Sequence, residues 1–148
     1  MKNQNERKNE RSSCRIGEIY YMKFEGTGSE QNGWRPGLVF QNNVGNAYSP
    51  NIIALSITSA RKKLYQPTHV LVESSDSGLK LDSVVQCENP ERMSKSRIGA
   101  YITTLPNKYM RQIAVASLLA TSAISYLDEE LLISVWEKAV ALNNGAQI

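Results

Sequence analysis

The chain has 148 residues, of which 41% are hydrophobic and 21% are charged, and its formal net charge is +3. This size and composition suit one globular domain with its own core and exclude a large multidomain enzyme. No apolar run reaches the ~18 residues that span a bilayer, and the polar N-terminus has no signal-peptide core, so we expect a cytoplasmic protein without a membrane segment.

Residues that bind metals or form acid–base pairs are scarce. There are two widely separated cysteines, Cys14 and Cys87, and one histidine, His69. Neither a zinc site nor a redox pair fits this set, so we expect free thiols, with Cys87 in the core. The acidic residues of 16–126 are scattered over different elements, which predicts no metal site and no cofactor.

Net charge and the pattern of apolar residues divide the chain into three parts. Residues 1–15 carry five basic against two acidic residues and nothing periodic to bury, which predicts a flexible basic arm. Residues 16–126 form the expected compact domain. Residues 127–148 are acidic and predict an additional C-terminal helix.

The first two thirds of the chain favour short strands. β-Forming or apolar runs bounded by turn residues occur at 17–24, 37–41, 52–58, 68–73 and 82–87. Turn-rich segments at 25–33, 42–46 and 74–78 connect them. About five closely spaced strands predict a small, curled antiparallel barrel.

The last third favours two helices. Thr104 can cap a helix with Pro106 in its first turn, and its apolar residues continue to Ile124. Asp128 can cap a second helix over 128–142, which carries one apolar stripe. The predicted fold class is therefore α+β, a small antiparallel β-barrel followed by helices.

The segment richest in reactive groups is 28–37. It places Glu30, Trp34 and Arg35 on a glycine-rich loop that enters a strand, an arrangement that can present polar groups to a ligand. Composition alone favours the simpler interpretation of a hairpin loop with an exposed arginine.

A set of short motifs occurs in a characteristic order. They are Gly-Ser-Glu-Gln at 28–31, Arg35-Pro36, the run from Gln41 to Pro50, Ala-Leu-Ser-Ile-Thr at 54–58, and Pro67-Thr68-His69-Val70. Together they resemble the MazF/PemK family of toxin endoribonucleases from type II toxin–antitoxin systems. The resemblance covers roughly Gly17 to Ile124, and its strength lies in the ordered set.

The resemblance implies a fold, a function and a site. The implied fold is an SH3-like β-barrel, and the implied protein is a homodimer. Its implied function is cleavage of single-stranded RNA (mRNA) at short sequences, with inhibition by a cognate antitoxin. The family's functional arginine and threonine fall on Arg35 and Thr58, and Glu30 is a further catalytic candidate. We expect RNA contacts from Ser29, Gln31, Trp34, Gln41, Arg61, Lys62 and Lys63.

The chemistry of RNA cleavage suits these residue types. Attack of a ribose 2′-OH on the adjacent phosphate builds negative charge, which the planar guanidinium of Arg35 can meet with two hydrogen bonds. Thr58 can donate to the same phosphate. The 2′-OH proton can pass to Glu30, to a phosphate oxygen or to water. This route needs no metal and leaves a 2′,3′-cyclic phosphate and a 5′-OH.

One segment departs from the family. Where members commonly show Gln-apolar-Arg-Thr, this chain has Asn89-Pro90-Glu91-Arg92, so a glutamate replaces a basic residue. An alternative function is a binding-only toxin of the same fold that inhibits DNA gyrase, and another is an interaction module without activity. His69, at the start of a strand, is interpreted as structural.

Overall fold

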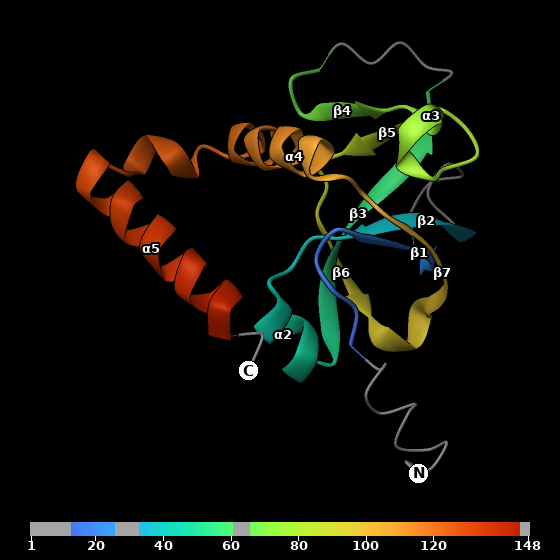
Figure 1. The fold of residues 1–148 in the computed structure, drawn as a ribbon, viewed down its shortest axis with the longest axis horizontal. Coiled ribbons are helices and arrows are strands. Elements are labelled where there is room, and N and C mark those ends of the chain that lie inside the picture. Colours follow the sequence, from blue (N-terminus) through green and yellow to red (C-terminus); the bar gives the residue numbers. More distant parts are fainter. Residues whose placement is uncertain (1–12, 26–32, 61–65, 146–148) are drawn as a thin grey trace.

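The computed structural model describes residues 13–25, 33–60 and 66–145. Within them, seven strands form one antiparallel sheet, and two longer helices follow it (Figure 1). The predicted α+β class is confirmed. The expected basic arm lies almost wholly outside the described residues, although Cys14, near its end, is buried in the core. No helix among the described residues is long and apolar enough to cross a membrane.

Five strands follow the predicted positions closely or with shifted ends. They are β1 (Glu18–Phe24), β2 (Gly33–Val39), β3 (Asn51–Ser59), β4 (His69–Val72) and β5 (Ser83–Gln86). β2 differs most from its prediction, because it begins at Gly33 and ends at Val39. Trp34 and Arg35, which we expected on a loop, therefore lie within a strand.

Several short elements were not predicted. β6 (Glu91–Ser94), a 3-10 turn η1 (Lys95–Arg97) and β7 (Ile98–Thr104) complete the sheet, and α2 (Asn43–Tyr48) occupies most of the expected 42–46 connection. The expected 74–78 turn contains the one-turn helix α3 (Ser74–Ser77). The side chain of Asn42 caps α2 by accepting a hydrogen bond from the Gly45 N–H, a local signal that favours helix initiation.

The curl of the sheet comes from β3, which changes partners along its length. The strand order is β4-β5-β3-β2-β1-β7, and β6 pairs with β3 as well. The first half of β3 pairs with β6, its middle with β2, and its end with β5. Because neighbouring strands twist relative to one another, this exchange of partners wraps the sheet around its core.

Two buried clusters fill the barrel and its helix-covered side. One contains Leu38, Val72 and Val85 together with Ile113 of helix α4 (Asn107–Ala120). The other contains Met22, Phe24 and Met93. Gly37 permits this packing, because a Cβ there would lie 2.5 Å from the Met22 sulfur. Alternate residues of β1 and β2 thus serve different clusters, as expected for a two-sided sheet.

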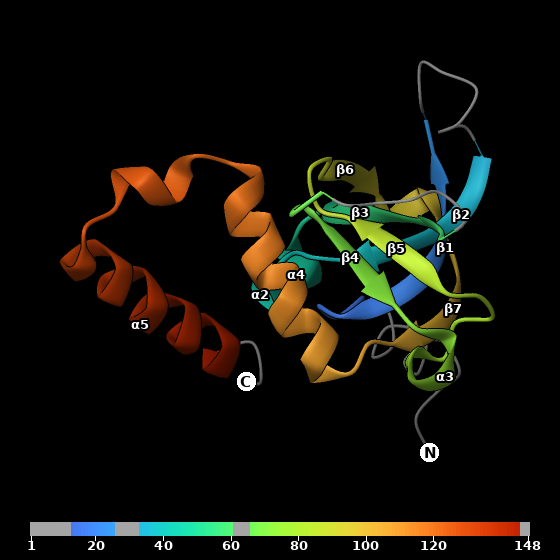
Figure 2. The same ribbon diagram turned by 90° about the horizontal axis from the view of Figure 1, so that it is seen from above.

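The helices partly correct the prediction. Thr104 ends β7, and Pro106 instead of Thr104 is the N-cap of α4. α4 buries Tyr109, Ile113 and Ala116 beside β4 (Figure 2), whereas Leu118 on the same helix is half exposed. The turn η2 (Ala123–Tyr126) leads to α5 (Glu129–Gly145). Asp128 caps α5 as predicted, because its carboxylate accepts the Leu131 N–H at 2.9 Å.

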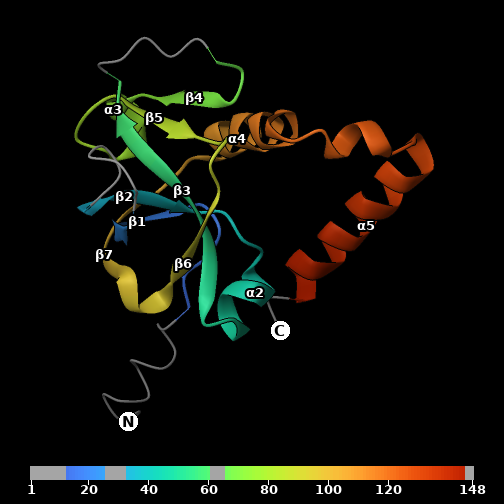
Figure 3. The same ribbon diagram turned by 180° about the vertical axis from the view of Figure 1, so that it is seen from behind.

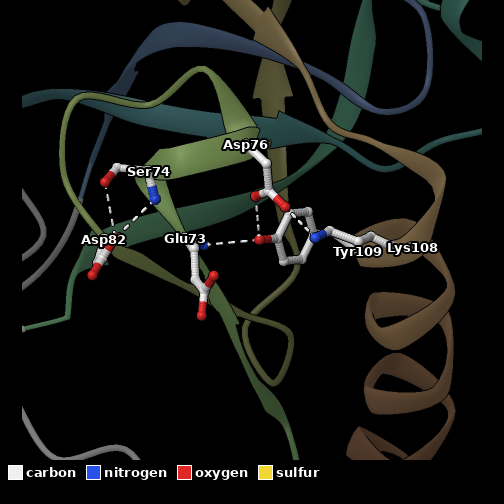
Figure 4. Close-up of polar contacts among 6 residues, drawn as sticks. All are labelled: Glu73, Ser74, Asp76, Asp82, Lys108 and Tyr109. Carbon is white, nitrogen blue, oxygen red and sulfur yellow. Dashed lines mark hydrogen bonds and ion pairs between the residues drawn. The ribbon is translucent and has the colours of Figure 1, made fainter.

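A polar network fastens α4 to α3 (Figure 4). Tyr109 donates from its hydroxyl to the Asp76 carboxylate at 2.5 Å and accepts the Glu73 N–H at 3.1 Å, while Lys108 pairs with the same carboxylate. The hydrogen bonds from Lys108 and Tyr109 hold the pKa of Asp76 below its usual value. α4 is therefore held by polar contacts at its N-terminal end as well as by its apolar face.

Candidate active site

Arg35 and Thr58 lie just beyond the end of the ladder that pairs the adjacent strands β2 and β3. The ladder between β2 and β3 pairs Gly37 with Ser56, and Val39 with Ala54. Continuing this register by two residues sets Arg35 across from Thr58, at the point where β3 leaves β2 and pairs with β5. Since side chains alternate along strands, both side chains share one face of the sheet. Both residues are partly buried, which limits their freedom while leaving them accessible.

The residues beside this pair on the same face are closely packed. Arg35 pairs with Met22, whose side chain is fully buried in the second cluster. Ser56, next to Thr58 on the same face, is buried, and its hydroxyl donates to the Gln86 side chain at 2.8 Å. Paired strands with buried, hydrogen-bonded neighbours therefore flank the candidate site.

Glu91 adds a carboxylate to this face. β6 pairs Glu91 with Ala54, which itself pairs with Val39 of β2. Partial burial raises the pKa of Glu91, and the positive charge of Arg35 acts in the opposite direction. In the sequence, Glu91 stands out only as a departure from the family pattern, so its position near Arg35 was not predicted. No local signal could have revealed it, because β6 was not predicted and the position of Glu91 depends on the pairing of β6 with β3.

Two hollows border the candidate site. A groove of about 540 Å³ is lined by Thr58 and by the exposed residues Tyr21, Tyr101 and Lys80 among others, whereas Arg35 is not among its lining residues. Tyr21 pairs with Pro36, so it lies on the face of the sheet opposite to that of Arg35. A polar hollow of about 280 Å³ lies at Glu91, where Arg92 and the ion-paired Arg97 and Glu25 line it. The groove offers aromatic rings and a lysine, which are the groups that bind bases and phosphates of a single strand.

Other predicted site residues lie elsewhere. Trp34 is 57% exposed, but as the neighbour of Arg35 on β2 it faces the other side of the sheet, and its ring packs over Gly99. Gln41 lies beyond the other end of β2, where its side-chain amide donates to the Asn51 carbonyl at 3.3 Å. The structure thus does not bring Trp34 or Gln41 to the Arg35–Thr58 pair.

Six predicted residues cannot be placed. Ser29, Glu30, Gln31, Arg61, Lys62 and Lys63 lie outside the described residues. The described strand ends show only where these segments attach. Phe24 and Gly33, which pair at the end of the β1–β2 ladder, flank the first segment, and Ala60, two residues after Thr58, precedes the second.

His69 and Cys87 have the surroundings expected of structural residues. The His69 side chain is 4% exposed, and its Nε2 lies 2.6 Å from a Glu88 carboxylate oxygen. Cys87 is a buried free thiol whose pKa is raised to about 11 by burial. Among the described residues, no group of three or more His, Cys, Asp or Glu side chains could hold a metal ion.

The protein is thus a small antiparallel barrel, and Arg35 and Thr58 form a polar candidate site at one end of its strands. Residues 15–119 match the family described as PemK-like, MazF-like toxin of type II toxin–antitoxin systems. The chain is therefore a member of this family, as the resemblance predicted.

Individual relatives agree with this assignment. The chain is 38% identical to Endoribonuclease MazF of Staphylococcus saprophyticus over 100 residues, which cover 67% of this chain and 83% of the relative. It is 34% identical to Endoribonuclease EndoA of Bacillus subtilis over 111 residues, covering 74% of this chain and 96% of the relative. A mycobacterial endoribonuclease solved with its cognate antitoxin shares the fold, with a TM-score of 0.59, 24% identity, and coverage of 75% and 97%.

Proposed function

We propose that this protein is a toxin endoribonuclease that cleaves single-stranded RNA in the cytoplasm and that a cognate antitoxin inhibits it. The single observation that carries the proposal is the placement of Arg35 and Thr58 at the same end of adjacent strands, on one face, in a member of the toxin family. The curated relatives named endoribonucleases, and the solved relative bound to its antitoxin, support it.

The proposed reaction is attack of the ribose 2′-OH on the adjacent phosphate. As the attacking oxygen bonds to phosphorus, negative charge builds on the phosphate oxygens, and the guanidinium of Arg35 meets it with a bidentate fork. Thr58 donates a hydrogen bond to the same group. The bond from phosphorus to the 5′ oxygen breaks, the leaving oxygen takes a proton from water, and the products are a 2′,3′-cyclic phosphate and a 5′-OH. The 2′-OH proton passes to Glu30, to a phosphate oxygen or to water.

The reaction as proposed requires no metal ion. The intramolecular 2′-OH supplies the proximity that a hydrolytic route would have to obtain from an activated water. The groove past Thr58 is a path for the strand, where Tyr21 and Tyr101 can stack on bases and Lys80 can neutralise a phosphate. In this arrangement the antitoxin blocks cleavage by competing with RNA for Arg35.

The test uses the purified full chain with a long RNA of known sequence, and the 5′ ends of the fragments are mapped. Arg35→Ala and Thr58→Ala should each keep the fold and reduce cleavage by about 10²-fold or more, because each removes a donor to the transition state. Arg15→Ala, which removes an exposed arginine away from the site, is the matched control and should cleave normally.

Near-normal cleavage by Arg35→Ala would show that the site is assigned wrongly. Failure of the unmodified protein to cut RNA, with inhibition of DNA supercoiling by gyrase instead, would favour the binding-only alternative.

A further inference from the structure

β2 and β3 separate beside the candidate site, and this separation joins the two faces of the sheet. Their ladder ends at Ser56 of β3, and from Ile57 onward β3 pairs with β5 instead. The groove of about 540 Å³ lies at this separation, because Pro36 of β2 and Thr58 of β3 both line it. A ligand that touches Thr58 can therefore continue from the face of Arg35 to the opposite face.

Three large aromatic side chains on or beside this opposite face remain exposed to solvent. Tyr21 is 42% exposed, Tyr101 is 55% exposed and Trp34 is 57% exposed. Tyr21 and Tyr101 line the groove, and Trp34 lies over Gly99, two residues before Tyr101 on β7. Because aromatic rings ordinarily stabilise a core or an interface, this aromatic surface of Tyr21, Trp34 and Tyr101 suits a ligand with flat apolar faces.

Two of these rings are fixed by contacts within the chain. The Tyr101 ring meets the Tyr20 ring edge-to-face at a centroid distance of 5.6 Å, and its hydroxyl lies 2.8 Å from the Thr104 hydroxyl. Gly99 allows the Trp34 ring to lie against β7, because a Cβ at this position would come within 2.9 Å of the ring. Rings held in this way lose little conformational entropy when a flat group stacks on them.

The charges around the aromatic surface favour a polyanion. Among the described residues that line the groove, Lys80 is the only charged one, and the exposed Lys23 pairs with Trp34 on the β1–β2 ladder. Asp82, close to Lys80 in the sequence, is directed to α3, where its carboxylate accepts hydrogen bonds from the Ser74 N–H and hydroxyl (Figure 4). Aromatic rings beside lysines are the groups that bind the bases and phosphates of a single-stranded nucleic acid.

The groove lies apart from the helices that follow the barrel. Figure 3 shows β7 and α3 on the side of the barrel away from α5, and Figure 1 shows the same arrangement from the opposite direction. None of the described residues that line the groove belongs to α4, α5 or β4. A ligand in the groove therefore contacts neither the exposed apolar side chains of α4 nor those of α5.

We propose that the RNA strand bends around the end of β2, with the cleaved phosphate at Arg35 and Thr58 on one face and the nucleotides on one side of that phosphate stacked on the aromatic surface. This inference rests on the proposed function and adds a second binding region to it, on the other face of the sheet. A flexible single strand can make this turn, whereas a double helix resists so sharp a bend. The aromatic surface therefore selects single-stranded RNA that extends well beyond the cleaved bond.

The test measures RNA binding by the full chain with and without a flank. The probes carry a 2′-deoxy nucleotide at the mapped cleavage position so that they resist cutting. One probe is short, and two others extend it by about six nucleotides on the 5′ side or on the 3′ side. Affinities are compared for the unmodified protein, Tyr101→Ala, the ring-conserving Tyr101→Phe, and the control Tyr126→Ala, which removes an exposed tyrosine from η2.

The proposal predicts that one of the two flanks tightens binding and that Tyr101→Ala weakens binding of this extended probe at least about 5-fold, leaving the affinity for the short probe unchanged. Tyr101→Phe and Tyr126→Ala should match the unmodified protein. Equal affinities of Tyr101→Ala and Tyr126→Ala for both extended probes would overturn the proposal even if the protein cuts RNA. A protein that neither binds nor cuts RNA would refute the proposed function, and this inference with it.

Two further measurements locate the flank independently of the tyrosine variants. In a Trp136→Phe background Trp34 is the sole tryptophan, and the extended probe should quench its emission while the short probe does not. Lys80→Ala should reduce the slope of log affinity against log salt concentration by about one for the extended probe, whereas Lys138→Ala on α5 should not. If Tyr101→Ala instead weakens inhibition by the antitoxin and leaves RNA affinity unchanged, the groove binds the antitoxin and the proposal is wrong.

Discussion

Helices α4 and α5 both carry apolar residues at helical spacing, yet α4 packs on the barrel and α5 does not. α4 inserts Ile113, which is fully buried, between strands of the first cluster, and Tyr109 anchors its first turn through Asp76. α5 buries none of its residues from 129 to 143 in the single chain. An apolar stripe therefore indicates that a helix face packs against another surface, but it does not show which surface that is.

The largest stability difference should separate these two helices. Ile113→Ala should lower the free energy of unfolding by about 2–5 kcal/mol at any protein concentration, because it leaves a cavity in the core. Ile133→Ala, in the exposed sector of α5, should lower it only at concentrations where chains associate. Urea unfolding at two widely separated protein concentrations measures both effects. A concentration-independent loss for Ile133→Ala would mean that α5 packs within its own chain.

A smaller effect, on the KM for RNA, is expected from Glu91 beside the candidate site. Glu91→Gln removes a negative charge near Arg35 and should lower KM for RNA about 2- to 5-fold at neutral pH, leaving kcat unchanged. Because the pKa of Glu91 is raised, the difference from the unmodified protein should disappear as acidification protonates Glu91. Steady-state cleavage across a pH series tests this, with Glu25→Gln as the matched control. A fall in kcat would instead make Glu91 a participant in the chemistry.

The smallest effect concerns the anchor of α4. The pKa of Asp76 is lowered in the folded state, so this carboxylate stabilises the fold above its unfolded pKa, and the contribution is lost as pH falls through the folded value. Asp76→Asn should therefore lower the thermal midpoint at pH 7 and approach the unmodified protein in acid. Ser75→Ala, an exposed neighbour, is the control. A midpoint difference that persists unchanged in acid would contradict the assignment.

Much of the fold could be predicted because its signals are local. The alternation of β1, the apolar runs of β3 to β5, and the Asp128 cap of α5 are visible in short windows. β6 was missed because it has only four residues, two of them charged, and β7 was missed because it is mostly exposed. Thr104 failed as a cap because pairing with Glu18 of β1 extends β7 to that residue.

The candidate site was predictable only in part. Arg35 and Thr58 follow from motifs that resemble a family, and the register then sets them at corresponding positions. Trp34 was grouped with Arg35 because the two are adjacent, although adjacent strand residues face opposite sides. Glu91 lies near the candidate site because β6 pairs with β3. This pairing joins residues that are far apart in the sequence, so the hydrophobic periodicity of either segment could not predict it.

The central claim is that Arg35 and Thr58 stabilise attack by the substrate's own 2′-OH, and its most direct test uses two matched RNAs. One is unmodified, and the other has a single 2′-deoxy nucleotide at the mapped cleavage position. The account predicts that the unmodified RNA is cut to a 2′,3′-cyclic phosphate and a 5′-OH in excess EDTA, whereas the deoxy RNA resists cleavage. Efficient cutting of the deoxy RNA, or loss of activity in EDTA with rescue by Mg²⁺, would contradict it.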